Sequence, residues 1–325
     1  MAEKKGFGTR MKSMFGFMKE VFSNFIDDKV MKFSAALSYY TIFSIAPILI
    51  IMISVAGAIF GKKAAQGQIY GQINGLVGSD AAAQIQEMIG NTHTSGKTFV
   101  ASVISIVALV FGATGVFAEI QDSINSIWGL KSKPTSGILK VLLNRLISFS
   151  LVISLGFVAM VTLMLNTVVD VLSKSLSKFI PGDDTLFVQI FNYILIFVVI
   201  TGMFAVIFKV LPDAKIKWKD VMRGAVITAI LFIIGKFVIT IYVTQSKLGS
   251  VYGAAGSIVV LLVWVYYTAV ILYFGAEFTK VYAIRYGGRI LPNDYAVWVK
   301  VNEEEQPNQE LAEVHARDES ESKNS

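Results

Sequence analysis

Cysteine is absent from this chain of 325 residues, and histidine occurs only twice, at His93 and His315. The lack of cysteine excludes disulfides and thiolate metal sites. Both histidines lie in polar segments, so histidine-based catalysis or metal binding has almost no material here. We therefore expect no catalytic residue, no metal site and no cofactor.

Charged residues are also scarce: they make up 16% of the chain, whereas 54% of it is hydrophobic. Soluble domains usually carry about 25% charged residues. Several uncharged runs are long enough to cross a hydrocarbon core of about 30 Å, which takes about 20 apolar residues. Composition therefore predicts that the chain lies in a membrane.

The hydrophobic runs predict an all-α fold, a polytopic membrane bundle of six transmembrane helices. The expected spans are 35–60, 98–120, 142–169, 186–210, 221–243 and 255–279. Together they form one domain, residues 34–285. Residues 286–325 form an acidic tail, which we expect to be cytoplasmic and disordered because it lacks apolar periodicity.

The distribution of basic residues predicts the orientation. Lysine and arginine concentrate in the amino-terminal segment, 1–33, and in the loops at 121–141 and 211–220. The positive-inside rule then places both termini in the cytoplasm, with the protein in the cell membrane. Within 1–33, apolar residues at helical spacing predict an amphipathic helix in the inner interface; the alternative is a helix packed on the cytoplasmic loops. These residues are Met11, Met14, Met18, Val21, Phe22 and Phe25.

The first span contains a run of hydroxyl groups followed by a proline. Tyr39, Tyr40 and Ser44 lie in its cytoplasmic half, and Pro47 lies near mid-depth. Proline removes its own amide donor and disturbs the carbonyl four residues earlier. Transporters often build a midplane site from a broken helix with polar groups beside the break. Kinked membrane helices also occur without such a role, so a substrate site and a plain kink both stay open.

The second span combines small residues with a polar inner end. Gly112 and Gly115 permit the close approach of another helix. Glu119, Asp122 and Asn125 follow at the inner boundary. Glu119 and Asp122 are three residues apart, so they share a helix face and are placed to meet a cation or a basic loop. A solvated helix end is the alternative.

Lys236 is the one charge deep within the fifth span. A lysine near the bilayer centre costs about 2.5–3.5 kcal/mol on insertion scales, so an intramembrane lysine is a functional hypothesis by default. It either binds an anionic group inside a cavity or extends its flexible stem towards the outer interface. The sequence leaves both interpretations open.

The last span begins with small residues, including Gly253 and Gly256, that permit close helix packing. Tyr266 and Tyr267 fall at its middle, so at least one hydroxyl must find an acceptor inside the bundle. Glu277 lies near the cytoplasmic end. It is either a boundary charge paired with Lys280 or a member of an inner polar cluster with Glu119 and the hydroxyls of the first span.

Several of these stretches occur together in one known family. They are AALSYYTIFSIAP at 35–47, GATGVFAEIQDSINSIW at 112–128, LPDAKIKWKD at 211–220 and VYGAAGS at 251–257. In this combination the chain resembles the YihY/BrkB family of bacterial inner-membrane proteins, which older annotation calls ribonuclease BN-like. The resemblance covers about residues 10–285. It implies an inner-membrane protein of six spans whose activity is poorly defined.

Three functions are consistent with these features. The first is a transporter or a lipid- or envelope-related permease, with the kinked span, Lys236 and the mid-depth tyrosines along its path. The second is a structural or assembly factor whose glycine-rich faces serve oligomer contacts. A ribonuclease is less favoured, because no polar segment is long enough to form a catalytic domain. The partners we expect are the lipid bilayer, an anionic or amphipathic small molecule or lipid, and a second copy of the chain, but not nucleic acid.

Overall fold

The computed structural model describes residues 7–61, 66–67, 70–71, 74, 82–83, 85–87, 99–132, 185–246, 252, 255–294 and 296–299. Four helices in this part are long and apolar enough to cross a membrane: α2 (Val30–Phe60), α7 (Thr185–Val210), α8 (Trp218–Ser246) and α10 (Gly256–Arg285). They carry four of the six expected spans. The expected span at 98–120 falls on another long helix, α5 (Phe99–Ile127), and the one at 142–169 lies outside the described residues.

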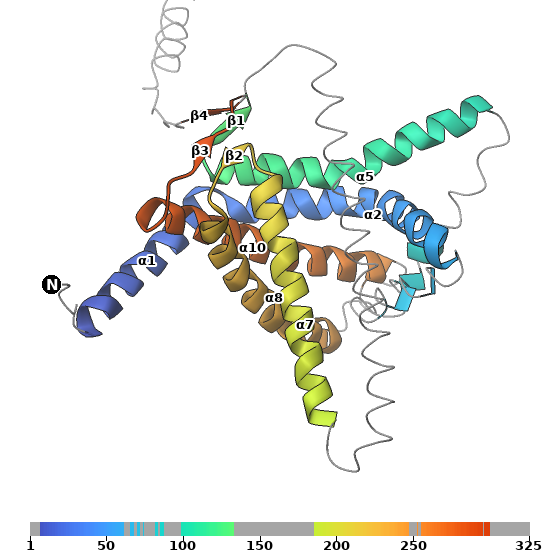
Figure 1. The fold of residues 1–325 in the computed structure, drawn as a ribbon. Helices are drawn as coiled ribbons and strands as arrows, with labels where there is room; N and C mark the ends of the chain where they lie inside the picture. The colour runs from blue at the N-terminus through green and yellow to red at the C-terminus, as the bar shows by residue number, and fades with distance from the viewer. Residues whose placement is uncertain are drawn as a thin grey trace, which may run out of the picture.

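The long helices pack in a fixed lateral order. Helix α2 contacts α5 on one side and α10 on the other, α10 contacts α8, and α8 contacts α7 (Figure 1). The largest side chains with almost no exposed surface gather on these contacts, among them Trp128, Phe208 and Tyr273. Helix α10 is therefore central to the described bundle, because it packs against α2 on one side and α8 on the other.

The amino-terminal helix α1 (Phe7–Asp27) packs on α10. Its buried residues Phe17 and Val21 share a cluster with Val281, and the Phe17 and Phe278 rings meet edge to face at 5.0 Å. The chain then turns into α2 at Lys29, whose φ of 56° lies in the left-handed region. A non-glycine residue seldom adopts this conformation, so the joint between α1 and α2 is a sharp and specific break.

Two short antiparallel strand pairs close one end of the bundle (Figure 1). Strand β1 (Leu130–Ser132) pairs with β4 (Ala296–Trp298), and β2 (Ala214–Lys215) pairs with β3 (Leu291–Pro292). The expected disordered tail from residue 286 is therefore wrong for its first part. The acidic composition starts only after residue 302, whereas Ile290 and Ala296 are buried.

Helices α8 and α10 approach most closely through two matched glycine–threonine pairs. A Cβ atom added to Gly224 would lie 1.8 Å from the Thr279 Oγ1 atom, and one added to Gly275 would lie 1.9 Å from the Thr228 Oγ1 atom. Each threonine hydroxyl donates to the carbonyl oxygen of the glycine one turn earlier on its own helix, at 2.7 Å. The glycines thus make room for the threonines, and the hydroxyls are satisfied within each helix.

Candidate functional site at the polar end of the bundle

Polar and charged side chains are buried together at one end of the described bundle, which we call the polar end. It comprises the α1–α2 joint, the carboxyl ends of α5 and α10, and the loop between α7 and α8. Its buried polar side chains are Ser123, Asn125, Asp213, Asp220, Glu277 and Thr279. In a chain with so few charges, this concentration makes the polar end the best candidate site.

Asp213, in the α7–α8 loop, is held by two amide side chains of α5. The Gln121 Nε2 atom donates to Asp213 Oδ1 at 3.0 Å, and the Asn125 Nδ2 atom donates to Asp213 Oδ2 at 3.0 Å. The Asp213 backbone amide in turn donates to Asn125 Oδ1 at 2.8 Å, and its carbonyl accepts from the amide of Asn293 at 3.0 Å. These four residues, the Asp213 cluster, tie α5, the loop and the carboxyl-terminal segment together.

Asp220, on the first turn of α8, makes a second link to the carboxyl-terminal segment. Its Oδ2 atom accepts a hydrogen bond from the amide of Gly288 at 3.1 Å. A Cβ atom added to Gly287 would lie 2.6 Å from the same oxygen, so the chain passes the carboxylate at a distance that only glycine permits. The polar end is thus built partly from backbone groups.

A network of three charged groups joins α10 to the α1–α2 joint, and we call it the ion network. The Lys280 Nζ atom lies 2.6 Å from Asp28 Oδ2 and 3.1 Å from Glu277 Oε1. Glu277 has no exposed surface, and besides Lys280 its carboxylate has the Asn24 side chain of α1 close to it. A fully buried carboxylate that shares its ammonium with Asp28 is sensitive to any charge that competes for that ammonium.

Close to the ion network, α5 and α10 share further buried polar groups. The Trp128 indole Nε1 atom donates to the carbonyl oxygen of Ala276 at 3.0 Å. The Ser123 hydroxyl donates to Glu119 Oε1 at 3.3 Å, and Tyr273 is fully buried nearby without a hydrogen bond to a described residue. Glu119 therefore faces the α5–α10 contact, but no hydrogen bond or ion pair in the described part links it to Glu277.

The structure does not bring Tyr39 and Tyr40 into this cluster. Their side chains are 60% and 44% exposed on α2, and their rings meet edge to face at 5.7 Å. The described residues therefore do not form the inner cluster of Glu277 with these hydroxyls, because both tyrosine side chains are exposed. The alternative, in which Glu277 pairs with Lys280, is the one that the structure has.

The residues around the proline of α2 form a packing contact with α5. A Cβ atom added to Gly112 would lie 2.9 Å from the Pro47 ring, and one added to Gly115 would lie 3.4 Å from the Ser44 hydroxyl. Ser44 is buried at this contact. Of the two glycines expected at the start of the last span, Gly256 is buried and Gly253 lies outside the described residues.

The two mid-depth tyrosines of α10 turn to different neighbours. The Tyr266 hydroxyl donates to the Met31 Sδ atom at 3.4 Å. The Tyr267 ring covers Gly235 of α8, where an added Cβ atom would lie 2.7 Å from its Cε1 atom. Tyr267 thus fills the space left by a glycine, and Tyr266 binds a thioether, a weak acceptor.

Lys236 lies on the exposed face of α8, beside exposed Phe237 and Val238. No described residue supplies its ammonium with a hydrogen bond or an ion pair. The described part of the chain therefore does not bring Lys236 together with Glu119, Tyr40 or Tyr267, as a common path along these residues would require. The expected span at 142–169 lies outside the described residues.

We expect Lys236→Leu not to lower the unfolding free energy, because the ammonium has no partner among the described residues and a lysine within a membrane span is itself costly. Lys280→Leu is the matched comparison, and it should destabilise the protein because two carboxylates lose their shared cation. Thermal unfolding of the detergent-solubilised protein measures both. If Lys236→Leu were as damaging as Lys280→Leu, Lys236 would have a structural partner.

Sequence reasoning missed Asp28, Asp213 and Trp128 as members of the site. Asp28 and Asp213 lie beside helix ends, where a carboxylate is ordinarily solvated, so composition alone gives no reason to bury them. The available signal was contextual: LPD at 211–213 interrupts two long apolar runs, and an aspartate at such a break often binds backbone or amide groups.

Comparison with known protein families shows which family this chain belongs to. A family model described as Virulence factor BrkB matches residues 21–295, a range that contains the ion network and the Asp213 cluster. The chain belongs to the BrkB family. This confirms the resemblance noted from the sequence motifs and, with its apolar helices, makes it a membrane protein.

Similar BrkB relatives occur in different bacteria. The chain is 25% identical over 265 residues to a protein named putative ribonuclease-like protein YfkH of Bacillus subtilis, covering 80% of this chain and 93% of YfkH. It is 26% identical over 279 residues to a UPF0761 membrane protein of Vibrio vulnificus, covering 83% of each. No solved structure matches the chain.

Proposed function

We propose that this BrkB-family protein is a permease that moves an anionic or amphipathic molecule, such as a lipid, across or within the membrane. The observation that carries the proposal is the ion network. Ionisable groups inside spanning segments are rare and mark substrate or ion pathways by default. Glu277 and Lys280 lie within the apolar helix Gly256–Arg285, and Asp28 lies at the joint that precedes the apolar helix α2.

The ion network has the properties of a gate at the polar end. Lys280 is a cation shared by two carboxylates, so an arriving anion competes with Asp28 or Glu277 for the same ammonium. Releasing Asp28 would free the α1–α2 joint, where Lys29 already holds a seldom adopted backbone conformation. Substrate binding and movement of α1 against α10 would then be coupled.

We place the protein in the cell membrane with six spans and both termini in the cytoplasm. Among the described residues, seven lysines and arginines lie in or beside the loops of the polar end, which supports a cytoplasmic position for it. These residues are Lys131, Lys215, Lys217, Lys219, Arg223, Arg285 and Arg289. Helix α1 exposes Met14, Phe15 and Phe22 beside Lys12 and Lys19, which suits an interfacial helix on that side.

Asp28→Asn is the sharpest test, because its neighbour provides a matched control. Asp28 binds Lys280 at 2.6 Å, whereas the exposed Asp27 accepts a hydrogen bond from Ser23 at 3.3 Å. In liposomes containing NBD-labelled phosphatidylglycerol, the protein should accelerate movement of the label between leaflets, measured by dithionite quenching. Asp28→Asn should change that rate at least about tenfold, as loss of a charge-assisted hydrogen bond suggests, and Asp27→Asn should not.

The alternative is a structural or assembly factor that acts as a homo-oligomer, and the close glycine–threonine packing of α8 and α10 favours it. On that alternative, Asp28→Asn lowers thermal stability, and neither the unaltered protein nor any variant moves the lipid. A ribonuclease is favoured by the name of one similar protein, the putative ribonuclease-like protein YfkH. Among the described residues, no three acidic or histidine side chains gather as metal ligands, which such an activity usually needs.

A further inference from the structure

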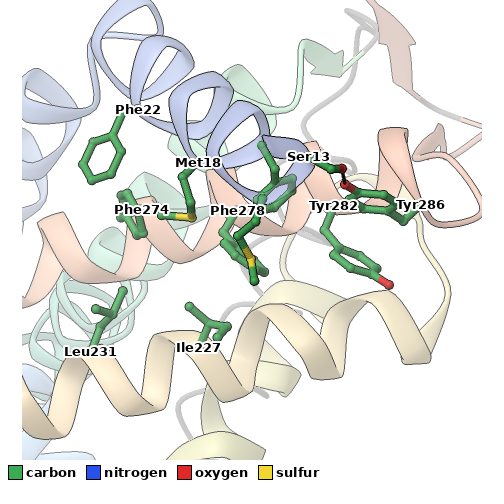
Figure 2. Close-up of a pocket in the computed structure, with 11 residues that line it drawn as sticks. Ser13, Met18, Phe22, Ile227, Leu231, Phe274, Phe278, Tyr282 and Tyr286 are labelled. Atoms are coloured by element: carbon green, nitrogen blue, oxygen red, sulfur yellow. Dashed lines mark hydrogen bonds between the residues drawn. The ribbon is translucent and has the colours of Figure 1, made fainter. Parts of the chain in front are cut away.

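An apolar groove runs between α1, α8 and α10, outside the ion network and the Asp213 cluster. Its volume is about 710 Å³, within the roughly 300–1,000 Å³ of pockets that hold small organic ligands. Figure 2 shows Phe274 and Phe278 of α10 along one wall, Ile227 and Leu231 of α8 opposite, and Met18 of α1 between them. Polar atoms occur at one end only, where the Ser13 and Tyr286 hydroxyls lie 3.1 Å apart.

The groove has the depth of one membrane leaflet. Leu231 lies 10 residues beyond residue 221, where the expected fifth span begins, which is roughly 15 Å along α8. Half of a hydrocarbon core of about 30 Å is about 15 Å. A ligand that enters at the tyrosine end would therefore reach the middle of the bilayer at Leu231.

Two arginines stand at the tyrosine end of the groove. The Arg223 guanidinium lies 4.9 Å from the centre of the Tyr282 ring, and the Arg285 guanidinium lies 5.7 Å from that of Tyr286. These rings are neighbours, with centres 5.5 Å apart. Each guanidinium also has a carboxylate partner: Arg223 Nη1 lies 3.7 Å from Asp220 Oδ1, and Arg285 Nη1 lies 3.2 Å from Glu20 Oε2. Because an arginine has five N–H donors and is well suited to bind a phosphate group, both side chains keep donors for an anion at the mouth of the groove, above its apolar floor.

We propose that the groove binds one anionic phospholipid of the leaflet next to α1. One acyl chain lies between α8 and α10 towards Leu231, and the headgroup phosphate contacts Arg223 and Arg285. A peptide or polar metabolite would find hydroxyl groups only at the mouth, with no partners along the floor. The lipid is a bound component of the protein whether or not the protein moves a substrate, so this inference is separate from the proposed function.

Native mass spectrometry of the purified full chain in detergent tests the inference directly. Titration with palmitoyl-oleoyl phosphatidylglycerol should give one saturable bound lipid, and phosphatidylcholine should bind about tenfold more weakly, because it does not satisfy the arginines as an anion does. Leu231→Trp should weaken both lipids at least about tenfold by filling the groove, and Ile227→Trp provides a second blocking variant. Val238→Trp, at an exposed position on the same helix, is the control that should bind normally.

Changing Arg223 and Arg285 to glutamine should remove the preference for phosphatidylglycerol while leaving phosphatidylcholine binding unchanged. Thermal unfolding of each variant checks that it is folded. The inference is overturned if phosphatidylglycerol does not saturate, if it binds no better than phosphatidylcholine, or if folded Leu231→Trp and Ile227→Trp bind lipid as well as Val238→Trp does. This experiment measures lipid binding and not lipid movement in liposomes. The inference of a bound lipid and the proposal of a permease can therefore be disproved independently of each other.

Discussion

Gly275→Ala is expected to destabilise the bundle by about 2–3 kcal/mol, the upper part of the range for overpacked cores. The added methyl group would lie 1.9 Å from the Thr228 Oγ1 atom and 2.9 Å from its Cβ atom. Rotation of the threonine cannot relieve the second contact, and its hydroxyl is held by the Gly224 carbonyl oxygen. The helices α8 and α10 would have to separate, and α10 packs on most of the described bundle. Equilibrium unfolding in mixed micelles measures the loss.

A second substitution at the partner position supplies the decisive control. Thr228→Gly removes the Cβ atom that obstructs the new methyl group, so Gly275→Ala should be much less harmful in the Thr228→Gly background. Gly202→Ala on α7 has no atom within 4 Å of the added Cβ and should be neutral or slightly stabilising. Equal losses from Gly275→Ala in both backgrounds would mean that the glycine serves some purpose other than accommodating Thr228.

Asn125→Ala is expected to cost about 2–6 kcal/mol, since two buried groups each lose a hydrogen bond, and each loss costs roughly 1–3 kcal/mol. The Asn125 side chain donates to the Asp213 carboxylate and accepts from the Asp213 backbone amide, and alanine does neither. Because Asp213 also binds the amide of Asn293, loosening the loop should loosen the carboxyl-terminal segment. Thermal unfolding should fall, and trypsin should cleave faster after Arg289.

Ser126→Ala provides the matched control, because Ser126 is exposed and adjacent on the same helix. It should leave both the unfolding temperature and the cleavage rate unchanged. A destabilised Asn125→Ala protein with normal cleavage after Arg289 would show that the Asp213 cluster does not hold the carboxyl-terminal segment.

The helices were predictable from the sequence because hydropathy and length decide them in a membrane chain. Their contacts were not, since a glycine or tyrosine in an apolar run does not reveal which neighbour it faces. Tyr39 and Tyr40 illustrate this: their position suggested an inner cluster, yet both side chains are exposed on α2. The pairs Gly224 with Thr228 and Gly275 with Thr279 share a four-residue spacing that was visible in the sequence, although only the structure matches one pair to the other.

The polar end was the least predictable part. Asn125, Glu119 and Glu277 were singled out as polar residues at an inner boundary, and the pairing of Glu277 with Lys280 was one of the two interpretations given for Glu277. What the sequence could not supply were the members that come from distant segments, Asp213 and Asp28. Asn125 binds Asp213, and Glu277 meets Lys280 together with Asp28. Short strands of two or three residues, such as β2 and β3, leave almost no periodic pattern to detect, so the ordered start of the carboxyl-terminal segment was assigned to a disordered tail.

The two strand pairs at the polar end also bear on how the protein is made. A ribosome releases residues 130–132 and 214–215 long before residues 291–298, which are their only strand partners in the described part of the chain. During synthesis these early segments must therefore wait, with backbone groups open to water, until the last apolar helix has entered the bilayer. The two strand pairs can therefore form only after α10 has been inserted, so their formation is a late step in the folding of this protein.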